Sequence, residues 1–296
     1  MVKIGQILQE KGAGLSFEFF PPKEKAGEDR LFETISKLER LQPDYVSVTY
    51  GAGGGTRKNT MEVVKRLLKE TSLVTMPHLT CINQSVQEIR TILEEYRDLG
   101  IENICALRGD PPVVDGKPVI PQDEPCHATH LVKLAKMVAD FSIAVAGYPE
   151  GHIESPDLAT DMFYTKLKVD TGADFIITQM FFENRYFFDF LERCQQMDIR
   201  VPIVPGIMPI GDINRMRQFC DKCGTTLPAR TAERFEKAGQ ATDELKKISL
   251  DTVLEQCSDL QRHGIKYFHF FTLNNQVDVI TNVVTSLGLR KVQEKV

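Results

Sequence analysis

The chain has 296 residues, of which 42% are hydrophobic and 26% are charged, a composition typical of a globular protein with a substantial core. No apolar run is long enough to cross a bilayer, which excludes a membrane-spanning protein. The net charge of -5 disfavours general binding to nucleic acid or to an acidic membrane surface, so the expected partner is a small molecule.

Short segments rich in β-branched and aromatic residues follow one another along the chain and are predicted to be strands. Between them lie stretches with apolar residues at helical spacing, for example Leu31, Ile35 and Leu38. Some of these stretches end in a glycine shortly before the next strand, as at Gly100 and Gly172. The predicted strands cover residues 15–19, 45–49, 73–80, 103–107, 143–146, 175–178, 202–205 and 266–271.

The regular alternation of strands and helices predicts an α/β fold, a closed (β/α)8 or TIM barrel, with a doubly wound sheet as the alternative. Residues 110–125 and 223–239 interrupt the rhythm, and we expect functional loops or short extra helices there. Because no linker is visible, we expect residues 1–296 to form a single catalytic domain.

A barrel of this type places its active site at the carboxyl ends of the strands. Seven of the eight predicted strands end in polar residues that are unusual for a core, although each one could also be a capping or turn residue. These residues are Glu18, Thr49, Tyr50, His78, Thr80, Arg108, Asp110, Tyr148, Glu150, Gln179, Thr272 and Asn274.

Glu18 is the sharpest candidate for catalysis. Strand alternation puts its carboxylate on the face opposite to Phe17 and Phe19, which is the inside of the barrel mouth. Poor hydration there would raise the pKa of Glu18 and make it a candidate general acid. The alternative is a glutamate paired with a lysine or arginine.

Asp110 is a second acidic residue at a strand end, and Gly109 before it allows a flat ligand to approach the backbone. Two carboxylates could indicate glycoside hydrolysis, but the chain has no tryptophan to stack on a sugar ring. The histidines are scattered without metal-binding spacing, so no metal is expected. The glycine-rich turn at 51–57 matches no nucleotide-binding fingerprint, yet it suits a phosphate or a flat ring.

The cysteines indicate a reducing compartment. There are seven, an odd and scattered set, and the first residues lack the apolar core of a signal peptide, so we expect a cytoplasmic protein. The one short spacing, Cys220 to Cys223, could form half of a zinc site or a redox pair, but the sequence has no second pair to complete a zinc ribbon.

Eight ordered segments contain the predicted strand ends and the residues around them. They are SFEFFPPK (16–23), YVSVTYGAGG (45–54), PHLTC (77–81), ALRGDPP (106–112), AVAGYPEGH (144–152), KVDTGADFIITQMFF (168–182), VPGIMP (204–209) and FHFFTLN (268–274). In these segments the chain resembles the short, bacterial type of 5,10-methylenetetrahydrofolate reductase. The similarity extends over nearly the whole chain, and the long regulatory region of the animal enzymes has no counterpart.

The resemblance implies a flavoprotein that holds FAD without a covalent bond. NADH or NADPH would pass a hydride to the flavin, and the flavin would pass it to methylenetetrahydrofolate in a ping-pong reaction that feeds methionine synthesis. It also implies a homo-oligomer. The sequence does not distinguish NADH from NADPH, although similarity to the bacterial members favours NADH.

The resemblance further assigns roles to residues. Glu18 would protonate the bridging nitrogen of the folate and open its five-membered ring to an iminium cation. Asp110 would lie between flavin and pterin, stabilise that cation and lower the potential of the flavin. FAD would contact Thr49, Tyr50, His78, Arg108, Gly109, Asp110, Ala128, Tyr148, His152, Asp161 and Lys168, and the folate would contact Asp110, Gln179, Arg215, Phe219 and Asn275.

The sequence departs from the family pattern at four positions. Asn275 replaces an arginine that usually contacts the folate, and Arg215 replaces a frequent glutamine. Leu167 and Tyr164 replace a frequent arginine and asparagine near FAD. Two other functions therefore stay open: a barrel hydrolase or lyase that uses Glu18 and Asp110 without flavin, and a folate-binding protein without turnover.

Overall fold

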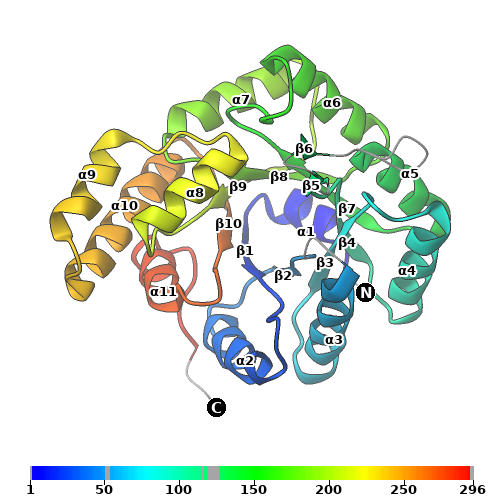
Figure 1. Ribbon diagram of the computed structural model, residues 1–296, viewed down its shortest axis with the longest axis horizontal. Coiled ribbons are helices and arrows are strands. Elements are labelled where there is room, and N and C mark those ends of the chain that lie inside the picture. The colour runs from blue at the N-terminus through cyan, green and yellow to red at the C-terminus, as the bar shows by residue number, and fades with distance from the viewer. Residues whose placement is uncertain (1, 51–53, 112, 115–116, 119–126, 294–296) are drawn as a thin grey trace.

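The computed structural model describes residues 2–50, 54–111, 113–114, 117–118 and 127–293. Eight parallel strands form a closed barrel in the order β1-β10-β9-β8-β7-β4-β3-β2, and helices surround it (Figure 1). The predicted (β/α)8 fold is confirmed. The barrel strands are β1 (Gly14–Phe19), β2 (Tyr45–Val48), β3 (Thr75–Thr80), β4 (Asn103–Leu107), β7 (Ser142–Gly147), β8 (Phe175–Met180), β9 (Ile203–Ile207) and β10 (Tyr267–Phe271).

The helices bury one apolar face against the outside of the barrel and expose the other to solvent. In α4, for example, Ile89, Ile92 and Leu93 are buried at helical spacing, and a capping box of Ser85 and Glu88 starts the helix. The helices are α1 (Ile4–Lys11), α2 (Ala26–Glu39), α3 (Gly54–Glu70), α4 (Val86–Asp98), α5 (Ala128–Val138), α6 (Leu158–Asp170), α7 (Asn184–Gln196), α8 (Ile213–Cys223), α9 (Ala229–Ala238), α10 (Thr242–Arg262) and α11 (Val277–Ser286).

The alternation of side chains along each strand separates two environments. Outward residues such as Phe17 and Phe19 join the large core between strands and helices. Inward residues such as Tyr45, Met76 and Phe175 fill a smaller core inside the barrel. Toward the carboxyl ends of the strands, buried polar residues such as Glu18, His78 and His269 occur in place of apolar ones. Such residues are candidates for a functional site.

Helix α1 packs against the inner core and closes the amino-terminal end of the barrel. Its Ile4 and Leu8 are fully buried there. The first backbone amides of the helix are satisfied by side chains from the strand starts, because Ile4 N donates to Asn103 Oδ1 at 2.8 Å and Gly5 N donates to Ser142 Oγ at 3.0 Å. Side chains of α1 therefore fill the amino-terminal end of the barrel interior.

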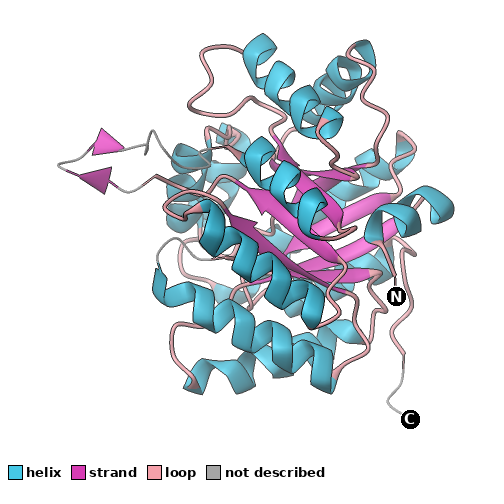
Figure 2. Ribbon diagram, turned by 90° about the vertical axis from the view of Figure 1, so that its right-hand side faces the viewer, coloured by secondary structure: helices cyan, strands magenta, loops and turns pink. Residues whose placement is uncertain are grey.

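The two predicted interruptions of the barrel rhythm differ in content. Residues 223–239 contain the additional helix α9. In the first interruption, β5 (Val113–Val114) and β6 (Lys117–Pro118) form an antiparallel pair that stands away from the barrel (Figure 2). The glycine-rich segment is shorter than expected, because α3 already begins at Gly54, and residues 51–53 lie outside the described residues.

Asn103→Ala is expected to lower the free energy of unfolding by about 1–3 kcal/mol, because it leaves the buried amide of Ile4 without an acceptor. The measurement is urea unfolding followed by circular dichroism. The matched control is Asn282→Ala on the exposed side of α11, which should change stability by less than about 0.5 kcal/mol. Equal effects of the two substitutions would contradict the role of Asn103.

Candidate functional site

Glu18 lies inside the mouth of the barrel, as its strand position predicted. It is only 6% exposed, and its Oε2 lies 3.3 Å from Nε2 of His269 on β10 and 3.4 Å from Nε2 of His78 on β3. No lysine or arginine among the described residues pairs with it. The carboxylate therefore faces two imidazoles in a nearly dry environment.

The predicted rise in the pKa of Glu18 is wrong. Burial raises the pKa, but the imidazole of His78 and then that of His269 favour the carboxylate, and together they hold the pKa below its ordinary value. Burial in turn lowers the pKa of His78, although Glu18 opposes this. The three side chains form one contiguous buried cluster, because both imidazoles lie within 3.4 Å of the same carboxylate oxygen.

Two further contacts orient this cluster. Ser16, two residues before Glu18 on the same inward face, lies with its Oγ 2.8 Å from Nδ1 of His269. Thr272 Oγ1 donates to the backbone oxygen of Glu18 at 2.6 Å, which ties the carboxyl end of β1 to that of β10. The imidazole of His269 is thus held between a hydroxyl and a carboxylate, with no exposed surface.

A second group of predicted site residues lies in the loop after β7 and on α6. The rings of Tyr148 and His152 meet edge to face with centroids 4.6 Å apart, and Lys168 Nζ lies 5.6 Å from the centre of the Tyr148 ring. Lys168 Nζ also donates to the backbone oxygen of Ala146 at 2.5 Å. Asp161 projects from the same helix as Lys168 and is 5% exposed.

The charges of Asp161 and Lys168 are both disfavoured by burial. Burial raises the pKa of Asp161 and lowers the pKa of Lys168 to about 8, while each charge partly stabilises the other. Asp161 Oδ2 is buried without a hydrogen-bond partner among the described residues. An unpaired buried acceptor next to a buried ammonium suits a ligand that brings hydroxyl groups and negative charge.

Arg108, which is expected to contact FAD, is already paired with a carboxylate. Its guanidinium forms a two-point contact with Glu154 at 2.5 and 2.7 Å, a partner that the sequence analysis did not identify. Gly109 has a φ of 85°, and a Cβ there would lie 2.8 Å from Cβ of Thr80. Lys168, on the same side of the mouth, forms no ion pair with the described residues, whereas Arg108 does.

The remaining predicted contacts occupy the rim. Thr49 and Tyr50 follow β2, and Thr49 N donates to Phe19 O at 2.9 Å. Ala128 starts α5, and Asp110 is exposed beyond β4. Gln179 lies near the end of β8, where its Oε1 accepts from the backbone amide of Met180 at 2.9 Å. These residues come from different strands yet border one opening.

Three of the residues expected to contact the folate, Arg215, Phe219 and Asn275, line one pocket of about 170 Å³. Arg215 lies with its guanidinium carbon 5.4 Å from the centre of the Phe219 ring, and Asn275 lines the pocket from the loop after β10. That loop has an unusual backbone, with φ of 48° at Leu273 and 57° at Asn274. The side chain of Asn274 holds it in place by bonding both the amide and the carbonyl of Phe20.

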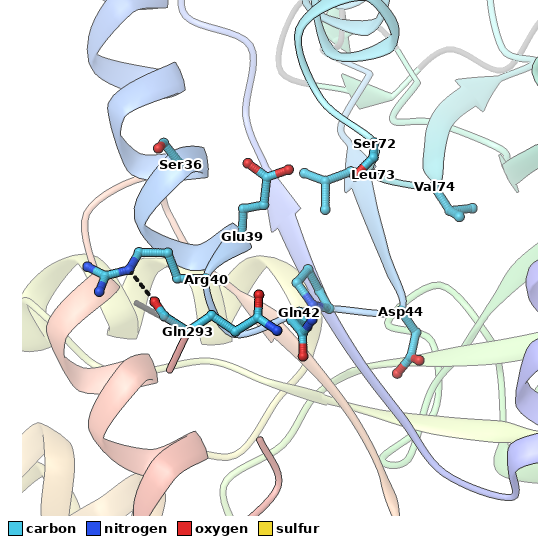
Figure 3. Close-up of a pocket in the computed structure, with 10 residues that line it drawn as sticks. Ser36, Glu39, Arg40, Gln42, Asp44, Ser72, Leu73, Val74 and Gln293 are labelled. Carbon is cyan, nitrogen blue, oxygen red and sulfur yellow. Dashed lines mark hydrogen bonds between the residues drawn. The ribbon is translucent and has the colours of Figure 1, made fainter. Parts of the chain in front are cut away.

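A larger cavity of about 430 Å³ lies at the opposite end of the barrel, between the end of α2 and the starts of β2 and β3 (Figure 3). Arg40 donates to the backbone oxygen of Gln293 there, at 2.9 Å. The buried Asp44 is already saturated by Lys11, Arg290 and the amide of Leu15. None of the predicted site residues lines this cavity, so it is not the candidate active site.

Sequence reasoning missed His269, Ser16 and Glu154. The first two stand on the inward face of their strands, and alternation from Glu18 and from Phe271 could have identified them. Glu154 lies in the loop between β7 and α6, where no periodic pattern in the sequence indicates a functional residue. In the described part of the chain, no group of three or more His, Cys, Asp or Glu is arranged to hold a metal, and no helix is long and apolar enough to cross a membrane.

Comparison with known proteins gives a consistent result. The family model described as methylenetetrahydrofolate reductase matches residues 3–288. The 5,10-methylenetetrahydrofolate reductase of Escherichia coli (strain K12) is 39% identical over 276 residues, which cover 93% of this chain and 91% of that protein. Methylenetetrahydrofolate reductase (NADH) 1 of Arabidopsis thaliana is 38% identical over 298 residues, which cover 97% of this chain and 50% of that protein.

The solved structures include an uncharacterized protein from Clostridium thermocellum that binds two copies of 5-methyl-5,6,7,8-tetrahydrofolic acid. It aligns with a TM-score of 0.65 at 13% identity and covers 95% of this chain and 98% of its own. At this level of identity the similarity supports the shared barrel fold alone.

Lys168→Met tests the buried ammonium. Because the pKa of Lys168 in the folded protein, about 8, lies below its ordinary value of 10.5, the unfolded chain binds more protons between these values. The contribution of Lys168 to stability therefore rises with pH through this window. Relative to Lys168→Met, the wild-type protein should gain about 2–3 kcal/mol of unfolding free energy between about pH 7 and about pH 10.

The measurement is urea unfolding of both proteins at a series of pH values. Lys133→Met, which removes an exposed lysine from α5, serves as the control and should show no comparable gain. A difference between wild type and Lys168→Met that stays constant with pH would show that the ammonium is not disfavoured by burial.

Proposed function

Because the chain belongs to the methylenetetrahydrofolate reductase family, we propose that it reduces 5,10-methylenetetrahydrofolate to 5-methyltetrahydrofolate, with FAD as cofactor and NADH or NADPH as electron donor. The observation that carries the proposal is the buried cluster of Glu18, His78 and His269 at the barrel mouth. The reaction would be ping-pong, and its product would feed methionine synthesis. We further propose a cytoplasmic homo-oligomer, and the free thiols of the described cysteines fit a reducing compartment.

The residues across the mouth fit a non-covalent FAD. When bound, FAD would carry a hydride from the reduced nicotinamide to the folate. The unpartnered Oδ2 of Asp161 suits a ligand hydroxyl, and the ammonium of Lys168 suits a phosphate. Arg108 contributes less charge than the resemblance implied, because Glu154 neutralises it. Thr49, Tyr50, His78, Gly109, Ala128, Tyr148 and His152 would complete the site.

Glu18 would hold and deliver the proton that opens the folate ring. Since its own pKa is lowered, the proton donor is better described as the buried cluster of Glu18 with His269 and His78 than as an isolated carboxyl. Ser16 would fix the orientation of the His269 ring through the contact at Nδ1. The burial of the cluster excludes bulk water, which keeps the proton directed to the substrate.

Asp110 and Gln179 would position the pterin. Both follow strand ends that open into the mouth, and the exposed carboxylate of Asp110 forms no ion pair within the described residues. Negative charge there would stabilise a cationic folate intermediate. Gln179 would offer its amide donors, since its oxygen is already engaged by Met180 N.

The pocket of Arg215, Phe219 and Asn275 would receive the aminobenzoyl-glutamate part of the folate. Phe219 offers a ring face, and Arg215 supplies a cation next to it. Asn275 carries no charge at the position where the family usually has an arginine. The substitution of a frequent glutamine by Arg215 puts positive charge back into the same pocket, so the two departures compensate each other.

The direct experiment is an anaerobic half-reaction test. The purified protein is expected to be yellow, to lose its flavin absorbance when a reduced nicotinamide is added, and to regain it when methylenetetrahydrofolate follows. Bleaching without recovery would favour a folate-binding protein without turnover. A colourless protein that cannot be reconstituted with FAD would favour a hydrolase or lyase and overturn the proposal.

Glu18→Gln should slow the recovery of flavin absorbance by folate by about a hundredfold or more, because an amide cannot donate the required proton. Bleaching by the nicotinamide should change little. Stopped-flow absorbance measures both half-reactions, and Glu62→Gln on the exposed face of α3 is the control. Equal loss of both half-reactions in Glu18→Gln would mean that Glu18 has a structural role only.

A further inference from the structure

Helix α8 lies on the mouth of the barrel and carries two of the proposed folate contacts, Arg215 and Phe219 (Figure 1). Together with Asn275 these two residues line the outer pocket of the site. On its other face, the buried Met216 and Cys220 pack in one apolar cluster with residues at the carboxyl ends of β8, β9 and β10. Because apolar contacts are non-directional, they leave the tilt of the helix to be set by polar contacts at its ends.

The segment after α8 is attached to the loop after β7 by one carboxylate. Both oxygens of Glu150 accept from the backbone amide of Thr226, at 3.1 and 3.0 Å. Thr226 lies three residues beyond the end of α8. The same two segments also meet at Gly224, where a Cβ would lie only 3.3 Å from Cβ of Ile153. The end of α8 is therefore held against the side of the mouth that carries the proposed flavin contacts.

The turn that presents Glu150 is itself well fixed. Gly151 N donates to Tyr148 O at 3.0 Å, which closes the turn, and Gly151 has a φ of 89°. Arg193 of α7 donates to the backbone oxygen of Pro149 at 2.7 Å. Tyr148, the first residue of the turn, is one of the proposed FAD contacts. The carboxylate of Glu150 thus has a defined position relative to the flavin site.

The bond from Thr226 to Glu150 connects two separate parts of the chain. Thr226 lies between α8 and α9, so its amide belongs to neither helix. Glu150 forms no ion pair within the described residues, and a carboxylate that accepts from an amide makes a stronger hydrogen bond than a neutral acceptor does. Glu150 was among the polar residues expected at the strand ends, yet neither the proposed cofactor contacts nor the proposed folate contacts include it.

We propose that Glu150 is a positioning residue for the folate, because through Thr226 it fixes the orientation in which α8 presents Arg215 and Phe219 to the substrate. The inference rests on the proposed function, since the folate must occupy the outer pocket. Without this bond α8 would stay folded on its apolar cluster, but its orientation would vary. Folate binding should then weaken while the flavin contacts on β7 and α6 keep their places.

The test measures binding of 5-methyltetrahydrofolate to the flavin-loaded protein and binding of FAD to the apoprotein. Glu150→Ala should weaken folate binding by about five- to twentyfold, the effect of losing one partly exposed hydrogen bond to a charged group. The affinity for FAD should change by less than about twofold. Glu150→Gln keeps an oxygen that can accept from Thr226 N, so it should recover most of the folate affinity.

A second readout follows the end of α8 without any ligand. Cys223 is the last residue of α8 and is half-buried. Its alkylation by N-ethylmaleimide, with the modified site identified by peptide mass spectrometry, reports how firmly this end of the helix is held. The rate at Cys223 should rise by about threefold or more in Glu150→Ala, because local opening becomes more frequent, and return toward the wild-type rate in Glu150→Gln.

The matched control is Glu192→Ala, which removes an exposed glutamate from α7 and should equal the wild type in all three measurements. Unchanged folate affinity in Glu150→Ala would overturn the positioning role. Equal loss of folate and FAD affinity would also overturn it, since that result indicates general loosening of the mouth, and so would a Glu150→Gln protein that behaves like Glu150→Ala. Failure of the wild type to bind 5-methyltetrahydrofolate would instead overturn the proposed function, and this inference with it.

Discussion

The site is organised around a carboxylate buried between two imidazoles inside a closed barrel. Glu18 is almost completely buried, and its charge is stabilised by His78 on β3 and by His269 on the adjacent strand β10. Each imidazole is positioned by the register of its strand, so the cluster exists only when the barrel is closed between β1 and β10. The environment of the Glu18 carboxylate therefore depends on the closed barrel and not on β1 alone.

The charged residues around the barrel mouth differ in how far their charges are neutralised by partners. Apart from the Glu18 cluster, the buried Asp161 and Lys168 interact electrostatically without forming an ion pair among the described residues, and Asp161 Oδ2 has no hydrogen-bond partner there. Arg108, although closer to the rim, is neutralised by Glu154. The outer pocket contains the cation Arg215. This distribution fits the proposed folate substrate, whose reactive end is neutral and whose tail is anionic.

The departures from the family pattern are easier to interpret once the pocket is seen as a unit. Arg215 on α8 and Asn275 after β10 are far apart in the sequence, yet both line the same small space beside Phe219. Arg215 supplies positive charge to this pocket, and the uncharged Asn275 contributes to its lining from a different element. The backbone of Leu273 and Asn274, held in a left-handed conformation by bonds to Phe20, sets the position of the loop that carries Asn275.

The sequence alone determined the order of strands and helices, the barrel and the inward direction of Glu18, because periodicity of side chains is a local property. It also predicted which polar residues follow the strands, and the structure places them near the carboxyl ends of those strands. Tertiary structure decided the rest. The pKa of Glu18 moved down instead of up because the effect of burial is outweighed first by His78, 3.4 Å away, and then by His269, which lies 251 positions away in the sequence and only 3.3 Å away in space. In the same way, Glu154 cancelled the charge of Arg108, since electrostatic partners are chosen by distance after folding and leave no periodic signal in the chain.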